Sequence, residues 1–167
     1  CGPSQQIDYY KEADPLSWTF SMSSEQNTLM GVEYVTKQLA GRTAEYAGDT
    51  SYHNQERVFG RLYIESGDAS VETNQDFINQ LAENGVDVVE TVAYALDPAT
   101  LQESAASAIA KFKSAGVTSV LFSSDPIAMR DFTREATAQG YFPEWVHIGS
   151  VLADTTAFAR TYDQEQW

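Results

Sequence analysis

The sequence predicts an α/β fold, a three-layer sandwich whose mainly parallel sheet carries helices on both faces, of the flavodoxin-like or Rossmann-like kind. Short β-prone runs alternate with longer segments of helical periodicity along the chain. The 167 residues are about one domain's worth, so we expect residues 17–167 to form a single α/β lobe after a flanking segment, 1–16. Glycine adopts a left-handed C-cap most easily, and the predicted helices before the last end at Gly41, Gly85, Gly116 and Gly140.

The first predicted strand and helix lie near the start of the chain. Residues 17–22 form a short β-prone run and are predicted to be a strand. Ser23 or Ser24 then offers a helix N-cap, and apolar residues recur at helical spacing as far as Leu39. Residues 42–57, rich in Gly, Asp, Ser and Asn, predict a surface loop.

The middle of the chain predicts two more strands around one helix. Residues 58–65 and 86–94 are the β-prone runs. Between them, residues 66–70 have the composition of a turn, and a helix with one apolar face begins at about Thr73.

The last part of the chain continues the same alternation. An Asp-Pro pair at 97–98 opens a helix, and residues 117–122 form a nearly continuous apolar run, typical of a strand buried in a parallel sheet. Residues 123–126 then cap another helix. Residues 145–148 predict a strand, and a last helix is expected from about Asp154. The predicted order is therefore strand followed by helix, repeated five times.

The chain is acidic, with 10 Lys and Arg against 24 Asp and Glu, and its net charge is −14. Nucleic acids and anionic membranes are bound by clusters of Lys and Arg, so nucleic acid is not an expected partner. Apolar residues make up 43% of the chain, enough for a core, and the single cysteine excludes a disulfide scaffold. No apolar run approaches the ~20 residues needed to span a bilayer.

No sequence motif for catalysis, a cofactor or a metal stands out. The dinucleotide fingerprint, the P-loop and the Gly-x-Ser-x-Gly pattern are absent. The two histidines, His53 and His147, have no ligand partner at metal spacing. Glu65 and Asp68 flank one turn, where they either hold a cation or, as is more usual, cap the turn. We therefore expect a protein that is not an enzyme and has no cofactor.

The carboxyl ends of the predicted strands are where an open parallel sheet binds its ligands. Small, hydroxylated and acidic residues gather there, at helix starts whose N–H groups suit a carboxylate or carbonyl oxygen, and Tyr94 would add an apolar wall. The alternative is that the Ser and Asp residues only cap the helices. The candidate ligand-binding residues are Ser66, Asp68, Tyr94, Ser123, Ser124, Asp125 and Ser150.

Several segments, taken in order, resemble one known family. Residues 131–150, DFTREATAQGYFPEWVHIGS, are similar to its pattern of a helix that ends in glycine, an aromatic link, and a strand that delivers a ligand-facing turn. Residues 117–126 resemble the family's preceding strand and the site loop after it. Residues 97–102 resemble the start of the helix before that strand, and residues 18–22 resemble the entry into the second lobe. From about 17 to 160, the chain thus resembles type I periplasmic solute-binding proteins, in particular the branched-chain amino acid branch of ABC-transporter binding proteins.

The resemblance implies one lobe of a two-lobed extracytoplasmic protein, periplasmic or lipid-anchored, that captures a small solute (an amino acid or related compound) for import. The solute would lie in a cleft against a missing second lobe of the same protein, and an ABC permease would be the partner. By position, Ser123 or Ser124 contacts the solute. Ser150 and Val151 match the turn where amino-acid binders place a carboxylate for the ligand ammonium. Because valine stands there, a different or larger solute is expected.

Two other functions stay open at this stage. A receptor or regulator uses such a fold as a ligand-sensing domain, and a small α/β enzyme domain would use Asp68, Asp125 and Ser150. Cys1 is interpreted as either a lipid-anchored cysteine or the start of a fragment, and the abrupt end at Trp167 also suggests a piece of a larger protein. An isolated lobe would expose its cleft face and could dimerise through it.

Overall fold

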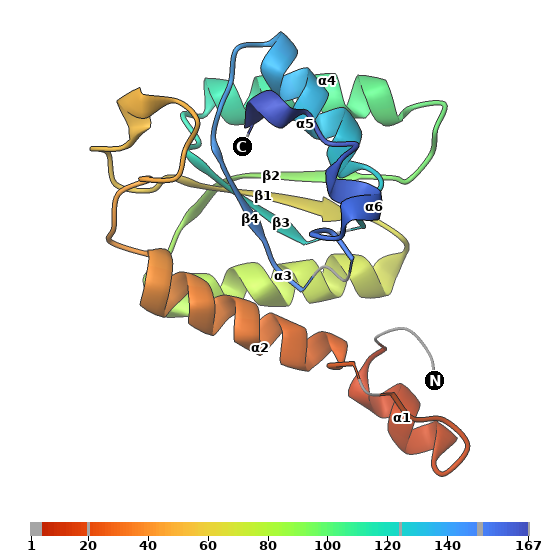
Figure 1. Ribbon diagram of the computed structural model, residues 1–167. Helices are drawn as coiled ribbons and strands as arrows, with labels where there is room; N and C mark the ends of the chain where they lie inside the picture. The colour runs from red at the N-terminus through yellow and green to blue at the C-terminus, as the bar shows by residue number, and fades with distance from the viewer. Residues whose placement is uncertain (1–4, 20, 124, 150–151, 167) are drawn as a thin grey trace.

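The computed structural model, which describes residues 5–19, 21–123, 125–149 and 152–166, contains one four-stranded sheet and confirms the predicted α/β class (Figure 1). The strand order is β2-β1-β3-β4, and each pair of neighbours is parallel. The strands are β1 (Phe59–Ile64), β2 (Val88–Tyr94), β3 (Ser119–Ser123) and β4 (Glu144–His147).

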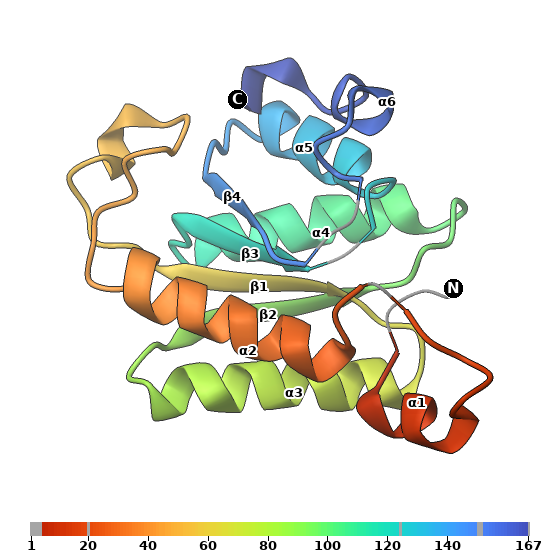
Figure 2. The same cartoon turned by 60° about the horizontal axis from the view of Figure 1, so that its bottom comes forward.

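Helices cover both faces of this sheet and complete the three layers (Figure 1, Figure 2). On one face lie α2 (Ser24–Tyr34) and α3 (Asp68–Glu83), and on the other lie α4 (Leu101–Ser114) and α5 (Met129–Ala138). The shorter elements are α1 (Ile7–Ala13), a π-helical continuation of α2 (Val35–Leu39), two 3₁₀ turns (Thr50–Tyr52 and Gln164–Gln166) and α6 (Thr156–Ala159).

The sheet divides the apolar core into two clusters. Successive strand side chains point to opposite faces, so Phe59 and Leu121 pack toward α2 and α3, whereas Leu62 and Phe122 pack toward α4 and α5. All four side chains are buried. Because β1 and β3 are covered on both faces, they read as apolar runs rather than as alternating patterns.

Gly31 sets how closely α2 approaches the rest of its layer. A Cβ at this position would lie 2.6 Å from Cγ2 of Ile148 and 3.0 Å from Cε2 of Phe77. The first distance is shorter than real Cβ atoms show and the second is tighter than most, so a larger residue would have to displace these side chains or the helix. The absence of a side chain at Gly31 therefore lets α2 pack this closely.

Local signals at helix ends are confirmed. Ser23 and Gln26 form a capping box at the start of α2: the Ser23 Oγ accepts from the Gln26 N–H at 3.2 Å, and the Gln26 Oε1 accepts from the Ser23 N–H at 2.9 Å. The predicted glycine stops have the positive φ of left-handed caps, with values of 68°, 78°, 70° and 60° at Gly41, Gly85, Gly116 and Gly140.

The predicted strand at 17–22 is wrong for its described residues, 17–19 and 21–22, which are not in a strand. Trp18 is 66% exposed and Met22 is 40% exposed. A β-prone run becomes a strand only where a neighbouring strand supplies hydrogen-bond partners, and this segment lies beside α1 and the start of α2 instead. The described sheet consequently has four strands rather than five.

Several helix starts also differ from the prediction: α4 begins at Leu101 rather than at the pair 97–98, and α5 begins at Met129 rather than directly after 123–126. Helix α3 begins at Asp68 rather than at Thr73, because the small polar residues predicted as a turn form its first helical turn after Gly67. The last predicted helix, expected from about Asp154, is the short α6.

Candidate functional site

The strand order reverses between β1 and β3. The chain leaves β1 through α3 to reach β2 on one side, and then crosses through α4 to reach β3 on the other side of β1. In open α/β sheets, ligands bind beyond the carboxyl ends of the strands at such a reversal. The carboxyl edge of β1 and β3 is therefore where the fold places a site.

Arg61, in the middle of β1, is a buried cation that reaches toward this edge. Its side chain is on the face of α3, and the residue is 4% exposed. Its Nε donates to Asn74 Oδ1 at 2.9 Å, and its Nη2 donates to Ser123 Oγ at 2.5 Å. Its Nη1 donates to the carbonyl oxygen of Leu121 at 3.4 Å, and the guanidinium lies 4.3 Å from the centre of the Phe77 ring. These contacts fix the guanidinium between β3 and α3.

Two surface hollows meet at Arg61. One, of about 330 Å³, lies between α2, α3 and the end of β4. The other, of about 570 Å³, lies between the start of α3, the loop after β1 and residues 5–9. The residues that line both hollows are Ser24, Arg61, Ile64, Thr73 and Ser123.

Arg61 is not matched by an acid in the described part of the chain, where no Asp or Glu oxygen lies within 4.0 Å of its guanidinium. Burial lowers the pKa of this guanidinium to about 9, because desolvation disfavours the charged form. The group remains protonated at neutral pH. The N-terminal ends of α2 and α3, which carry partial positive charge, lie at the same edge as this guanidinium.

Acidic side chains stand near the two hollows but do not line them. Glu25, Glu72 and Asp76 line a smaller neighbouring hollow of about 160 Å³. Glu72 and Asp76 are exposed and Glu25 is half-buried at the surface, so solvent screens their charges more than it screens the buried charge of Arg61. The local charge at the bottom of the hollows is therefore that of Arg61.

Two of the predicted ligand-binding residues lie at Arg61. Ser123 lines both hollows and accepts the Arg61 hydrogen bond, and Ser66 lines the larger hollow. Asp68 is an exposed residue in the first turn of α3 and lines neither hollow. The predicted residues that lie outside the described part of the chain are Ser124, Ser150 and Val151.

Tyr94 and Asp125 lie together on the opposite face of the sheet. The Tyr94 Oη donates to Asp125 Oδ2 at 2.6 Å, and Tyr94 is buried in the cluster beneath α4 and α5. The other carboxylate oxygen, Asp125 Oδ1, accepts from the N–H groups of Ile127 at 2.7 Å and Ala128 at 2.8 Å. Asp125 therefore caps the turn at 126–128 that precedes α5 rather than the helix itself, whose N-cap residue Ala128 makes no side-chain cap bond, and Tyr94 is not a wall of the hollows at Arg61.

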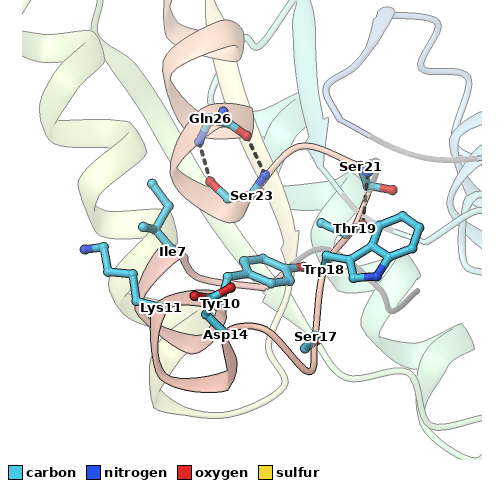
Figure 3. Close-up of a pocket in the computed structure, with 10 residues that line it drawn as sticks. All are labelled: Ile7, Tyr10, Lys11, Asp14, Ser17, Trp18, Thr19, Ser21, Ser23 and Gln26. Carbon is cyan, nitrogen blue, oxygen red and sulfur yellow. Dashed lines mark hydrogen bonds between the residues drawn. The ribbon is translucent and has the colours of Figure 1, made fainter.

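A separate hollow of about 590 Å³ lies between α1 and the segment that follows it (Figure 3). Tyr10 stands in the middle of its lining side chains, with Lys11 and Trp18 at opposite ends. Most of this wall is exposed, and Lys11 is paired with Asp8 at 2.7 Å. Because none of its charged lining residues is buried, this hollow is a weaker candidate than the one at Arg61.

A fifth hollow, of about 750 Å³, lies between the end of β4 and α6. It is lined by His147, Asp154, Arg160 and Tyr162 among others. Burial lowers the pKa of His147, although the charge of Asp154 opposes this shift. Since the lining carries charges of both signs, it does not define one ligand chemistry.

Sequence reasoning missed Arg61, the residue on which the site depends. The available signal was a single charged residue inside the apolar run Phe59–Ile64. Lys and Arg are almost never fully buried unless they are paired, so an arginine within a strand predicted to be covered on both faces indicates a special role.

The fold and the site define an α/β domain with a buried cation at the reversal of its strand order. A comparison with models of known families finds no match for the chain, and a comparison with curated proteins finds no similar sequence. Within the described residues, no helix is both long and apolar enough to cross a membrane, and no group of three or more His, Cys, Asp or Glu side chains could hold a metal ion.

Proposed function

We propose that this chain is one lobe of an extracytoplasmic solute-binding protein, which captures a small solute at the carboxyl edge of β1 and β3 for import through an ABC permease. The observation that carries the binding role is the pair of hollows that meet at Arg61, a buried and oriented cation at the reversal of the strand order. The transport context is supported by the resemblance of residues 17–160 to type I solute-binding proteins.

Binding fits these hollows better than catalysis does. Their lining offers hydroxyl groups from Ser24, Ser66, Ser70, Thr73 and Ser123. A hydroxyl becomes a strong nucleophile only beside a general base, and the described lining residues include no His, Cys, Asp or Glu. Hydroxyl groups around a fixed cation instead supply directional hydrogen bonds that orient a solute.

The shape of this site supports the proposal of a second lobe. Ligand pockets bury roughly 70–90% of a small ligand's surface, and shallow hollows on one sheet edge leave the other side of a solute in water. In a two-lobed protein the opposite lobe covers that side. The isolated chain should therefore bind solutes weakly, and the complete protein should bind them much more tightly.

The experiment is a nuclear magnetic resonance titration of the isotopically labelled 167-residue chain with a panel of amino acids, organic acids, sugars, polyols and polyamines. The complete translation product of the gene is screened in parallel by calorimetry. We expect at least one solute to shift the amide signals of residues 61–73 and 123 saturably. If no solute does so, and the complete product binds none, the proposal is wrong.

A matched pair of variants locates the binding site. Thr73 lines both hollows, whereas Gln75 is exposed on the same helix and lines neither. Thr73→Tyr should fill the hollows and abolish binding, and Gln75→Tyr should leave it unchanged. Equal effects of the two substitutions would place the solute elsewhere.

A further inference from the structure

We infer that the solute is an organic acid whose carboxylate binds in the hollows at Arg61, between the guanidinium and the Ser123 hydroxyl. This inference rests on the proposed function and names the chemical class of its solute. It also departs from the resemblance, in which this lobe presents a carboxylate to a ligand ammonium. Here the lobe presents a cation instead.

The hydrogen-bond inventory of Arg61 is the first argument. A guanidinium has five N–H donors, and three of them bond to described residues: Asn74, Leu121 and Ser123. Two donors, one on each terminal nitrogen, are left for a ligand. Two donors in a planar fork are the arrangement that binds both oxygens of a carboxylate.

Ser123 adds a third donor at the same place. Its Oγ accepts the hydrogen bond from Nη2 of Arg61 at 2.5 Å, which leaves its own O–H directed by rotation toward an acceptor. Ser123 lines both hollows together with Arg61. A carboxylate bound there therefore meets charged and neutral donors at once.

Charge balance is the second argument. Burying the charge of Arg61 among neutral partners costs free energy. A bound anion would neutralise this charge, as a neighbouring Asp or Glu does for other buried cations. A single positive charge matches a monoanion. A phosphate dianion would leave one negative charge unbalanced at this single cation, so a carboxylate fits better.

The register between β1 and β3 is the third argument, because it sets how far the Arg61 guanidinium lies below the carboxyl edge of the sheet. Arg61 pairs with Leu121, and its guanidinium reaches Ser123, which pairs with Tyr63 nearer the carboxyl end. The cation therefore lies beneath the rim of the sheet edge and is reached through the hollows. A slim planar group at the end of a solute reaches it most easily.

The test uses acetate as the probe, acetamide as its neutral isostere and inorganic phosphate as the competing anion, each at constant ionic strength in sodium chloride. The signal observed is the Nε–H resonance of Arg61 in the labelled chain, and the same resonance of Arg57 is the internal reference. Acetate should shift the Arg61 signal saturably and leave Arg57 unchanged. Acetamide and phosphate should each bind at least tenfold more weakly.

Two variants keep the test independent of folding. Arg61→Lys keeps the charge but loses the planar fork, and should weaken acetate binding about tenfold or more, as read from the amide signals of residues 61–73 and 123 because the Arg61 side-chain signal is lost. Ser123→Ala keeps Arg61 and should weaken acetate binding severalfold, as read from the Arg61 signal itself. Each variant counts only if its amide spectrum shows the native fold, and the wild-type comparison of acetate with acetamide stands without either of them.

The outcomes separate this inference from the proposed function. Equal binding of acetate and acetamide, tighter binding of phosphate, or equal shifts at Arg57 would overturn the carboxylate assignment. If a neutral solute from the panel binds at the hollows while acetate does not, the solute-binding function stands and the inference is wrong. If neither acetate nor any solute of the panel binds at the hollows, the proposed function and the carboxylate inference are both wrong.

Discussion

The two buried arginines of this sheet, four positions apart in sequence, have opposite surroundings. Arg57 lies at the amino edge, and its Nε and Nη2 donate to the two carboxylate oxygens of Glu144 at 2.7 and 3.0 Å. Its Nη1 also donates to the carbonyl oxygen of Leu39 at 3.2 Å. Arg61, in contrast, has only neutral hydrogen-bond partners among the described residues. We call the amino edge, with its internal ion pair, the closed edge, and the carboxyl edge, whose cation has no acidic partner among the described residues, the open edge.

The remaining bonds of Glu144 strengthen this contrast. Its Oε2 accepts from the Ser119 hydroxyl at 2.7 Å, and its Oε1 accepts from the Tyr46 N–H at 2.8 Å. Burial alone would raise the pKa of Glu144, but the hydrogen bonds from Arg57, Ser119 and Tyr46 outweigh it and hold the pKa below its ordinary value. A fully satisfied buried network of this kind has a structural role.

The largest effect should come from Arg57→Met. This change leaves the Glu144 carboxylate buried without its cation, so the free energy of unfolding should fall by about 3–5 kcal/mol. Urea denaturation followed by circular dichroism measures it. The double change Arg57→Met with Glu144→Met serves as the control and should recover most of the loss. A double variant as unstable as the single one would show that the ion pair is not the cause.

The next largest effect should come from one of two serines, Ser119, which bonds to Glu144, and Ser123, which bonds to Arg61. Ser119→Ala removes a fully buried bond to Glu144 and should cost about 1.5–3 kcal/mol. Ser123→Ala removes a bond to Arg61 beside a hollow that water enters, so its cost should be about 1 kcal/mol or less. Both values come from the same denaturation series. A reversed order would contradict the division into a closed and an open edge.

Arg61→Met should destabilise the chain less than Arg57→Met does. The change leaves only neutral acceptors without a partner, and it relieves the burial of a charge, so the loss should be roughly 1–2 kcal/mol. The two variants delete the same side chain from similarly buried positions, which makes them a matched pair. A loss at Arg61 equal to that at Arg57 would indicate that Arg61 is a structural residue.

The smallest effect should appear in the pH dependence. Because the pKa of Glu144 is lowered from its ordinary value of 4.5 in the folded state, its contribution to stability is complete above that value. The contribution is lost as the pH falls through the lowered pKa. Glu144→Gln should therefore flatten the fall in stability at acid pH, whereas Glu33→Gln on the exposed surface should flatten it less. Parallel acid profiles for wild type and Glu144→Gln would contradict this.

Sequence reasoning predicted the features that depend on neighbouring residues along the chain. The N-cap expected at Ser23 or Ser24 and the glycine stops follow from local backbone chemistry, and the α/β alternation follows from periodicity. The strand at 17–22 failed because strand formation requires a partner that no local pattern can supply. A β-prone composition is a necessary signal but not a sufficient one.

The candidate site was predicted in part for a related reason. Ser123 and Ser66 were expected at the carboxyl edge, and both line the hollows there. Tyr94 and Asp125 were expected beside them, but they lie on the other face of the sheet. Which face a residue occupies depends on strand order and helix placement. Arg61 was missed because its burial and its lack of an acidic partner exist only in the folded sheet.

A substitution at Gly31 would change the shape of the smaller hollow without changing any residue that lines it. Gly31 lines neither hollow, yet Ile148 and Phe77, the side chains that a Cβ at this position would strike, line the smaller one. Alanine there would push these two side chains toward the ligand space or move α2 away from it. The width of the smaller hollow therefore depends on the residue at position 31, which lies behind the side chains that line it, and Gly31→Ala should change the shape of that hollow.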